Sequence, residues 1–438
     1  MLKKLYVFAL LSALGLLGGC GGSSSSNSGS TTPPPVTPTQ PAATPALYTE
    51  TNAITGNEVL AYSRGSNGSL TSISSYSTGG AGQGLPTATG ALPFPIGGAT
   101  GAVTVNPVGA LLYAVDGGSN DVAAFSVATN GTLTFIANYP TGGIAPGSIS
   151  IDSTGTYLYV LNTGNVATDG LGSGATGGIT GFTIGSTGAL TALANSTQPL
   201  STGTGGAYVD ASEIAFAPGG QYLVVTEKLS QYNGAPAPGT IDIYPVTSGV
   251  AGPGVFTAST GVIPFGFAFT SSGAFVVSNV AANPFDILGG TDQNEGSATS
   301  YTIASGAPTV VSATVGDNQN APCWIALTPS GSYAYATNTI SGTVSGYSVS
   351  STGALTLLAP ASGTSATATL TPPSGGVAGP IDDIVSPDGA YLYVIQSNFG
   401  GTPGSIDGFS INSTTGALTS ITAGVTNLPV GSIGLAVR

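Results

Sequence analysis

A short phrase recurs along the chain and limits its fold more than any other feature of the sequence. The phrase is a strand-like run, in most copies containing tyrosine, that follows an apolar run and a turn such as NPVG, TPSG or SPDG. Its copies lie roughly 58 residues apart, which indicates a repeat architecture. The seven copies are LYTET (47–51), LYAVD (112–116), LYVLN (158–162), LVVTE (223–227), FVVSN (275–279), AYATN (334–338) and LYVIQ (392–396).

Each repeat predicts four short strands. A third strand, such as GTVSGYSV, follows the tyrosine run, and a glycine-bearing hairpin then leads into a fourth that begins GALT. Val, Ile, Thr and Tyr alternate with small polar residues, so the composition is all-β. The runs that precede the tyrosine strand are AVTV (102–105), SISI (148–151), EIAF (213–216), GFAF (266–269), WIAL (324–327) and DDIV (382–385).

The two ends of the repeat array complement each other. The first copy, at residue 47, has no preceding strand, whereas SIGLAV (432–437) has no repeat of its own. The final strand would complete the first sheet and hide its inner edge. The sequence therefore predicts an all-β, seven-bladed β-propeller with four-stranded blades, closed by the C-terminal strand. An open solenoid such as a β-helix is the alternative, but it does not account for the matched ends.

The N-terminal segment predicts export and anchoring. Residues 1–20 combine two lysines, an apolar stretch too short to span a bilayer comfortably, and Leu-Gly-Gly-Cys, which resembles a bacterial lipobox. We expect a lipoprotein signal peptide with lipid on Cys20, and an ordinary secretory signal is the alternative. Residues 21–46, rich in Gly, Ser and Pro, predict a disordered tether before the propeller at 47–438. We therefore expect a lipid-anchored protein of the bacterial cell envelope, in the outer membrane and periplasm or at the cell surface.

The charge balance excludes several functions. Charged residues make up 5% of the chain, histidine is absent, and 18 acids face 5 Lys and Arg. Beyond the signal, only Arg64, Lys228 and Arg438 are basic, so a nucleic-acid or anionic-lipid surface is excluded. Without histidine there is no Ser-His-Asp or Cys-His system and no histidine zinc site. With Cys20 lipidated, Cys323 has no disulfide partner, and we expect it to be a core residue. Carboxylate chemistry remains.

Four phrases resemble one known family. LVVTEK (223–228), PFGFAF (264–269), APCWIALTPSG (321–331) and the Thr-Gly-Ala-Leu hairpin (352–355) resemble the lactonase-like seven-bladed propellers, which include 6-phosphogluconolactonase and carboxymuconate cyclase. The resemblance covers residues 47–438 and implies lactone opening or closing at one mouth of the central channel. It also implies a site of His, Glu and Arg, from which this chain departs. A phosphorylated lactone is a poor candidate, because a phosphate calls for Arg or Lys.

The candidate catalytic residues lie at the start of the innermost strands, where equivalent positions face the channel at one level. The two acids there, Glu213 and Asp382, are predicted on opposite sides of the axis, and Asp383 adjoins the second. Beside Trp324 or Phe265, a carboxylate pKa would rise and suit a general base. We predict Glu213 as the base, with Asp382 and Asp383 orienting substrate or holding a metal. The alternative is that Glu213 pairs with Lys228 or accepts backbone N–H bonds. The six positions are Ala102, Ser148, Glu213, Gly266, Trp324 and Asp382.

A second polar ring ends the tyrosine strands. Together with Trp324 it is the predicted ligand-binding set, although the same side chains could cap loops and turns instead. Its members are Asp116, Asn162, Glu227, Asn279, Asn338 and Gln396. A divalent cation such as calcium is a further option for carboxylates, in the segments 286–296 and 116–121. Those segments are equally consistent with solvated connections. Lys228 is predicted to be a structural cation.

Two functions remain open from the sequence. One is a lactonase-type hydrolase acting on an uncharged sugar lactone or cyclic ester. The other is a non-catalytic surface propeller that binds a protein or glycan. Convergence of Glu213, Asp382 and Asp383 would favour the enzyme, and a channel filled by Trp324 and Phe265 would favour the binding protein. We expect a monomer that meets the membrane through its lipid only. We also expect stability to vary little with pH except in the acid range, where carboxylates protonate.

Overall fold

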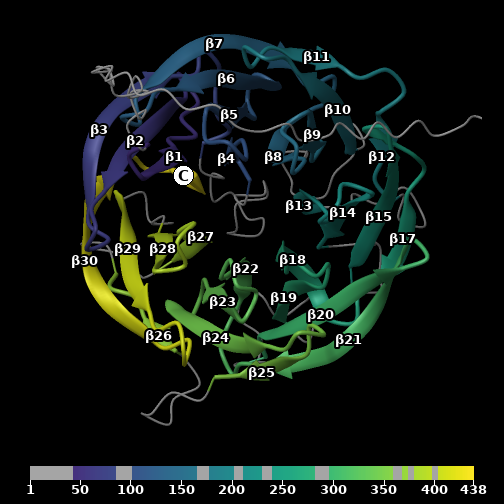
Figure 1. Ribbon diagram of the computed structural model, residues 1–438, viewed down its shortest axis with the longest axis vertical. Coiled ribbons are helices and arrows are strands. Elements are labelled where there is room, and N and C mark those ends of the chain that lie inside the picture. The colour runs from purple at the N-terminus through teal and green to yellow at the C-terminus, as the bar shows by residue number, and fades with distance from the viewer. Residues whose placement is uncertain are drawn as a thin grey trace, which may run out of the picture. The chain divides into compact units, whose positions relative to one another are not determined.

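Seven small antiparallel sheets form a ring in the computed structural model (Figure 1). The structure describes residues 43–84, 101–164, 177–201, 211–228, 239–281, 295–358, 367–372, 379–396 and 403–438. All of them belong to one compact unit, Ala42–Arg438. Cys20, the predicted signal peptide and most of the predicted tether lie outside the described residues. Every regular element among the described residues is a strand, and no helix there is long and apolar enough to cross a membrane.

The sheets follow one another along the chain as blades 1 to 7. Blade 1 contains β1 (Ala46–Glu50), β2 (Glu58–Arg64), β3 (Leu70–Ser77) and β31 (Ile433–Val437). Blade 2 contains β4 (Val103–Val105), β5 (Leu111–Asp116), β6 (Asp121–Val127) and β7 (Leu133–Pro140). Blade 3 contains β8 (Pro146–Ile151), β9 (Tyr157–Asn162), β10 (Gly178–Ile184), β11 (Leu190–Ala192) and β12 (Gln198–Pro199). Blade 4 contains β13 (Ala211–Phe216), β14 (Tyr222–Glu227), β15 (Thr240–Thr247), β16 (Val250–Ala251) and β17 (Val255–Ala258).

The remaining blades repeat this plan. Blade 5 contains β18 (Val262–Phe269), β19 (Phe275–Ala281), β20 (Ser297–Ala304) and β21 (Ala307–Gly316). Blade 6 contains β22 (Pro322–Leu327), β23 (Tyr333–Asn338), β24 (Thr343–Val349), β25 (Leu355–Leu357) and β26 (Ala368–Thr369). Blade 7 contains β27 (Pro380–Val385), β28 (Tyr391–Gln396), β29 (Gly404–Ile411) and β30 (Leu418–Leu428). In blades 3, 4 and 6 the outermost strand is divided into two short pieces that pair with the same neighbour.

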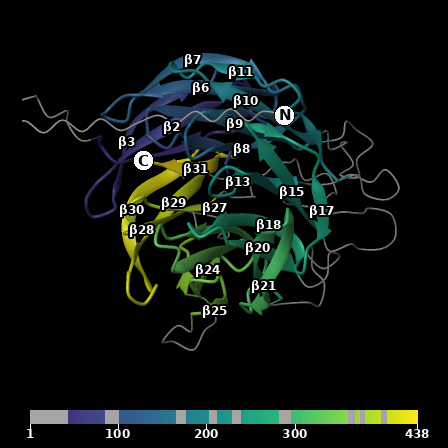
Figure 2. The same cartoon turned by 45° about the vertical axis from the view of Figure 1, so that its right-hand side comes forward.

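The ring closes through the C-terminal strand, as the sequence predicts. β31 pairs antiparallel with β1, placing Leu47 opposite Val437 and Tyr48 opposite Ala436. In Figure 1 the yellow β31 lies beside the purple β1, and Figure 2 shows the tilted ring with β7, β17, β21 and β30 at its rim. The prediction of a seven-bladed β-propeller is confirmed, and the solenoid alternative is wrong.

Apolar side chains fill the seams between neighbouring blades. Strand side chains alternate between two faces, so each sheet contributes to the seam on either side of it. Val224 and Ile241 of blade 4 pack with Phe267 and Phe275 of blade 5, for example. The cluster at the seam of blades 7 and 1 also reaches Trp324 on β22, together with its neighbours on β18. The core is therefore divided among the seams, and its cluster at the seam of blades 7 and 1 extends to blades 5 and 6.

The repeated tyrosine has a structural role at these seams. In five blades the hydroxyl of the second residue in the phrase donates to a glycine carbonyl in the outer hairpin of the next blade. Blades 4 and 5 carry Val224 and Val276 there and lack this hydroxyl. A hydrogen bond of this kind contributes about 1 kcal/mol. The five bonds are Tyr48 to Gly131 (3.1 Å), Tyr113 to Gly188 (3.0 Å), Tyr159 to Gly249 (2.8 Å), Tyr335 to Gly416 (2.9 Å) and Tyr393 to Gly68 (2.7 Å).

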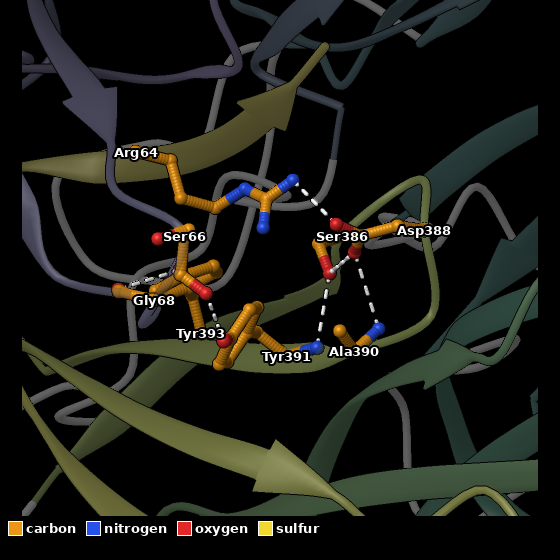
Figure 3. A network of polar contacts seen from close by, with 8 residues as sticks. All are labelled: Arg64, Ser66, Gly68, Ser386, Asp388, Ala390, Tyr391 and Tyr393. Atoms are coloured by element: carbon orange, nitrogen blue, oxygen red, sulfur yellow. Dashed lines mark hydrogen bonds and ion pairs between the residues drawn. The ribbon is translucent and has the colours of Figure 1, made fainter.

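The seam between blades 7 and 1 carries an additional polar network (Figure 3). Arg64 Nη2 lies 2.7 Å from Asp388 Oδ2, and its guanidinium carbon lies 5.4 Å from the ring centre of Tyr391. Ser386 Oγ donates to Asp388 Oδ1 at 2.6 Å and accepts the Tyr391 N–H at 3.0 Å. Asp388 is about half exposed, so its ion pair with Arg64 adds little stability. The network fixes the position of Arg64 at this closing seam.

Candidate functional site

The inner strands begin with a repeated irregularity. In blades 3, 4, 6 and 7 the register with the second strand shifts between the first and third residues of the inner strand, as between Pro380 and Asp382. Such a bulge re-aims the side chains that follow it. Glu213 on β13 and Asp382 on β27 occupy the position directly after the bulge, which Ser148 occupies in blade 3.

In blades 3, 4 and 7 this position joins the blade to the next one. Ser148 Oγ accepts the N–H of Ile214 at 3.3 Å, and Glu213 Oε2 accepts the N–H of Phe267 at 2.7 Å. Asp382 Oδ2 accepts the N–H of Leu435 at 2.8 Å. Glu213 therefore accepts a backbone N–H, as one of the alternatives from the sequence proposed. Part of the capacity of Glu213 and Asp382 is used to hold neighbouring inner strands together.

Asp383 breaks the pattern of the repeat. The equivalent residue in blades 3 to 6 is apolar and buried: Ile149, Ile214, Phe267 and Ile325. Asp383 is also buried, with 5% of its surface exposed. Neither of its carboxyl oxygens has a hydrogen-bond partner, although its own N–H donates to Asp382 Oδ1 at 2.9 Å. An acid in an apolar position with two unused oxygens is costly for the fold and indicates another role.

The three acids influence one another although β13 and β27 lie on facing sides of the ring (Figure 1). Burial raises the pKa of Glu213 well above its usual range; the Phe267 N–H opposes this shift and Asp382 adds to it. Burial also raises the pKa of Asp383, and so do the charges of Asp382 and Glu213. The Ala326 N–H offsets part of that shift without reaching hydrogen-bond geometry. Carboxyl groups with raised pKa values are suited to accept or donate protons near neutral pH.

An apolar sector separates the two acid-bearing strands on one side. Trp324 on β22 is 1% exposed and packs edge-on against Phe265 on β18, with 5.0 Å between ring centres. Lys228 Nζ lies 4.6 Å from the centre of the Phe265 ring. Trp324, predicted to bind a ligand, is thus covered by protein. Cys323 beside it is free and buried, and burial raises the pKa of its thiol to about 12, so the prediction of a core residue is confirmed.

The side chains of the second polar ring are buried and hydrogen-bonded within their own blade or to the blade beside it. All six of its side chains are at most 2% exposed. Asn338 Nδ2 donates to Thr343 Oγ1 and Ser345 Oγ, both at 2.9 Å. Asn162 donates to Thr180 (3.4 Å), Asn279 to Thr299 (2.7 Å) and Gln396 to the Thr371 carbonyl (2.7 Å), while Asp116 accepts from Thr78 (2.7 Å) and Glu227 from the Ser201 N–H (2.7 Å). This is the capping arrangement that the sequence offered as the alternative to ligand binding.

The structure describes only part of the proposed calcium segments. Residues 286–294 lie outside the described residues. In 116–121, Asp116 Oδ1 accepts from Asn57 and Thr78, and Asn120 Oδ1 accepts the N–H of Ala145 at 2.7 Å. Burial raises the pKa of Asp116 to about 7. No group of three or more acidic, His or Cys side chains in the described residues is arranged to hold a metal.

Sequence reasoning missed several buried acids. Asp242 on β15 and Asp407 on β29 lie inside their blades, facing Glu227 and Gln396 of the second ring. Burial raises the pKa of both, to about 6 for Asp407. The repeat contains a signal for these two acids, because Thr-Ile-Asp (240–242) and Ser-Ile-Asp (405–407) are equivalent phrases in the third strand of their blades.

The two arginines of the propeller are used structurally. Arg64 pairs with Asp388 at the seam of blades 7 and 1. Arg438 donates through Nε to the Thr44 carbonyl (3.2 Å), through Nη1 to Gly109 (3.2 Å) and through Nη2 to Thr129 (2.7 Å). Neither guanidinium is left to bind a phosphate beside Glu213 or Asp383.

The comparisons with known proteins agree with the architecture. Residues 55–167 match the family model described as lactonase, 7-bladed beta-propeller, which confirms the resemblance to that family over this part of the chain. No curated protein matches the sequence.

Among solved structures, similar ones extend along most of the chain. A putative 6-phosphogluconolactonase from Bacteroides fragilis is 19% identical with a TM-score of 0.60, over 91% of this chain and 100% of that one. The periplasmic gluconolactonase of Pseudomonas aeruginosa is 14% identical with a TM-score of 0.57, over 89% and 99%. At these identities the likeness establishes the fold alone.

Proposed function

We propose that the protein hydrolyses an uncharged sugar lactone or a related cyclic ester. Residues 55–167 of the chain match the seven-bladed lactonase family, which supports this reaction class. The reaction is placed where the inner strands β13 and β27 carry Glu213, Asp382 and Asp383. The observation that carries this proposal is the Asp383 carboxyl group, which is buried with both oxygens unpartnered beside the buried Asp382. The gluconolactonase and 6-phosphogluconolactonase named among similar structures give the reaction class its support.

The acids divide the steps of lactone hydrolysis among them. The Glu213 carboxylate takes a proton from water, whose oxygen adds to the lactone carbonyl carbon. The ring C–O bond then breaks, and the released alkoxide oxygen takes the proton back from Glu213. Asp383, kept neutral by burial, donates a hydrogen bond to the carbonyl oxygen as negative charge develops there. Asp382 accepts the N–H of Asp383 and thereby positions it.

The substrate class follows from the missing cations. A phosphate group binds best to Arg or Lys. Both arginines of the propeller have other partners, and the Lys228 ammonium lies over Phe265. A neutral aldonolactone carries no charge, so the site needs no cation to bind it.

Hydrolysis of a panel of neutral aldonolactones by residues 43–438 tests the proposal. We expect turnover that Glu213→Gln lowers by at least 100-fold, within the range attributed to a general base. Glu58→Gln is the matched control, because it changes an acid on β2 and not on an inner strand. It is expected to retain wild-type turnover. Parallel assays with EDTA detect any dependence on a bound metal. Equal rates for wild type, Glu213→Gln and buffer would contradict the proposal.

A second candidate is a non-catalytic propeller that binds a glycan or protein through its loops. The packing of Trp324 against Phe265, both buried next to the acid-bearing strands, favours it. The same panel separates the two candidates, because a binding protein leaves every lactone at the buffer rate.

We also propose that the propeller is a monomer attached to the bacterial cell envelope by lipid on Cys20, and that this lipid is its membrane contact. The support is the lipobox-like Leu-Gly-Gly-Cys and the Gly/Ser/Pro-rich segment that follows it. Incorporation of labelled palmitate by the full chain in a bacterial host tests the anchor. Wild type should be labelled and Cys20→Ser should not; equal labelling would contradict lipidation at Cys20.

A further inference from the structure

Two acids lie side by side inside blade 4 with a single hydroxyl between them. Glu227 ends β14 and pairs with Thr240 on β15. Asp242 follows Thr240 by two residues on β15, so Thr240 and Asp242 lie on one face of that strand. Neither acid is exposed to solvent. Thr240 Oγ1 lies 3.0 Å from Glu227 Oε2 and 2.8 Å from Asp242 Oδ1.

The hydrogen-bond donors around this pair are unequally shared. Glu227 Oε1 accepts the Ser201 N–H at 2.7 Å, and Oε2 is in contact with the Ser201 hydroxyl as well as with Thr240. Asp242 Oδ2 is buried and has no partner. A hydroxyl group has one hydrogen, so Thr240 cannot donate to both acids. Two charged carboxylates would leave one of these close oxygen–oxygen contacts without a proton.

We propose that Asp242 carries a proton at neutral pH and donates it to Thr240 Oγ1, which in turn donates to Glu227 Oε2. Each oxygen–oxygen contact then contains one hydrogen, and the pair of acids buries one negative charge instead of two. Asp242 is the acid that carries the proton, because Ser201 and Thr240 both donate to Glu227. Burying a second, unpaired carboxylate would be far more costly than burying a neutral carboxyl group.

The groups around the pair agree with this assignment. Tyr244 donates its hydroxyl to the Pro199 carbonyl at 2.9 Å, and the burial of Tyr244 and the nearby acids raises its pKa. Lys228 follows Glu227 in the chain, and its ammonium lies over Phe265 of blade 5. Glu213 on the adjoining β13 faces the Phe267 N–H. The outer strand β17 (Val255–Ala258) and the adjacent β18 carry no titratable group. Burial, and then Glu227, raise the pKa of Asp242 well above its usual range.

Because Asp242 is protonated in the folded protein, blade 4 is more stable at acidic pH. The pKa of Asp242 is higher in the folded than in the unfolded chain, where it is about 4. Its contribution to stability is therefore complete below about pH 4 and is lost as the pH rises through the folded value. A protein built this way is most stable in an acidic medium.

The carboxyl 13C signals of aspartate-labelled residues 43–438 test the proposal directly. At pH 7 we expect several neutral carboxyl signals, because Asp383 and other aspartates are buried as well, and we expect one of these signals to disappear in Asp242→Asn. We also expect the fall in melting temperature between pH 5 and pH 8 to be smaller in Asp242→Asn than in wild type. Asp388→Asn is the matched control: the pKa of this half-exposed acid is lowered, so its replacement should not reduce that fall.

Two results would overturn the proposal. One is a spectrum in which Asp242 shows only the ionised carboxylate signal at pH 7. The other is a melting temperature at pH 8 that rises with added calcium or sodium chloride in wild type but not in Asp242→Asn, since a bound cation would then replace the proton. If Asp242→Asn does not fold, the signal is assigned in wild type from its β-carbon correlations, and the spectrum decides.

Discussion

Two groups of polar side chains occupy equivalent positions in successive blades, and the protein uses them differently. At the ends of the second strands, polar residues such as Asn338 occur in every blade from 2 to 7 and are hydrogen-bonded to their own or a neighbouring blade. At the starts of the inner strands, Asp383 alone replaces an apolar residue and has two buried oxygens without a partner. A position that is polar throughout the repeat supports the fold, whereas one that is polar in a single blade marks a candidate site.

Among the tests of this comparison, a change of pH should have the largest effect on the free energy of unfolding, because both groups of side chains contain buried acids. Burial raises the pKa of Asp116 to about 7 and of Asp407 to about 6, and raises the pKa values of Glu50, Glu213 and Asp383 well above their usual range. Acids with raised folded pKa values stabilise the protein fully below about pH 4, and that stability is lost as the pH rises through the folded values. A tenfold change in one acid's ionisation constant on folding corresponds to about 1.4 kcal/mol. The free energy of unfolding should therefore be several kcal/mol higher at pH 5 than at pH 8.

This prediction reverses the sequence expectation, which placed the loss of stability in the acid range. Urea unfolding monitored by tryptophan fluorescence at pH 5 and pH 8 measures the difference. Lower stability at pH 5 than at pH 8 would show that the acids are not buried as described.

Asn338→Ala should give the next largest effect. It removes two buried hydrogen bonds and leaves the hydroxyls of Thr343 and Ser345 without their donor. We expect a loss of roughly 2–3 kcal/mol in the free energy of unfolding. Ser74→Ala, on the exposed face of β3, is the control and should change stability by less than about 0.5 kcal/mol. A loss for Asn338→Ala no larger than the control's would remove the structural role of the second ring.

Asp383→Asn should act in the opposite direction. Because Asp383 has no hydrogen-bond partner for its oxygens, a neutral isostere removes no bond, and it removes the free-energy cost of keeping a buried acid from ionising as the pH rises. We expect a gain of about 1 kcal/mol at pH 8 and no gain at pH 4, where the acid is already neutral. Urea unfolding at the two pH values checks this. A loss at pH 8 comparable to that of Asn338→Ala would place Asp383 with the structural acids.

Tyr393→Phe should give a smaller loss and calibrates the others. Its hydroxyl donates to Gly68 at 2.7 Å across the closing seam. We expect a loss of about 1 kcal/mol. The natural valines at positions 224 and 276 show that seams without this bond are tolerated. A loss above about 3 kcal/mol would mean that the closing seam depends on this tyrosine far more than the other seams do.

The sequence predicted the blades well because their physics is local and repeated. Tyrosine strands, Pro/Gly turns and an unused strand at 432–437 suffice to specify the ring and its closure. The roles of Glu213 and Asp382 were less predictable, since their partners, the N–H groups of Phe267 and Leu435, are 54 and 53 residues away in the chain. The burial of Trp324 and the pairing of Glu227 with Asp242 depend on packing between strands, which repeat spacing does not specify.

The pH dependence of lactone turnover tests the central claim most directly, namely that the acids on the inner strands carry the chemistry. With the best neutral aldonolactone, we expect kcat/KM of the wild type to rise through an ionisation above the usual carboxyl range, because burial raises the pKa of Glu213. That ionisation should be absent from Glu213→Gln and unchanged in Asn338→Ala. A rate that follows the same pH profile in wild type and Glu213→Gln would contradict the claim.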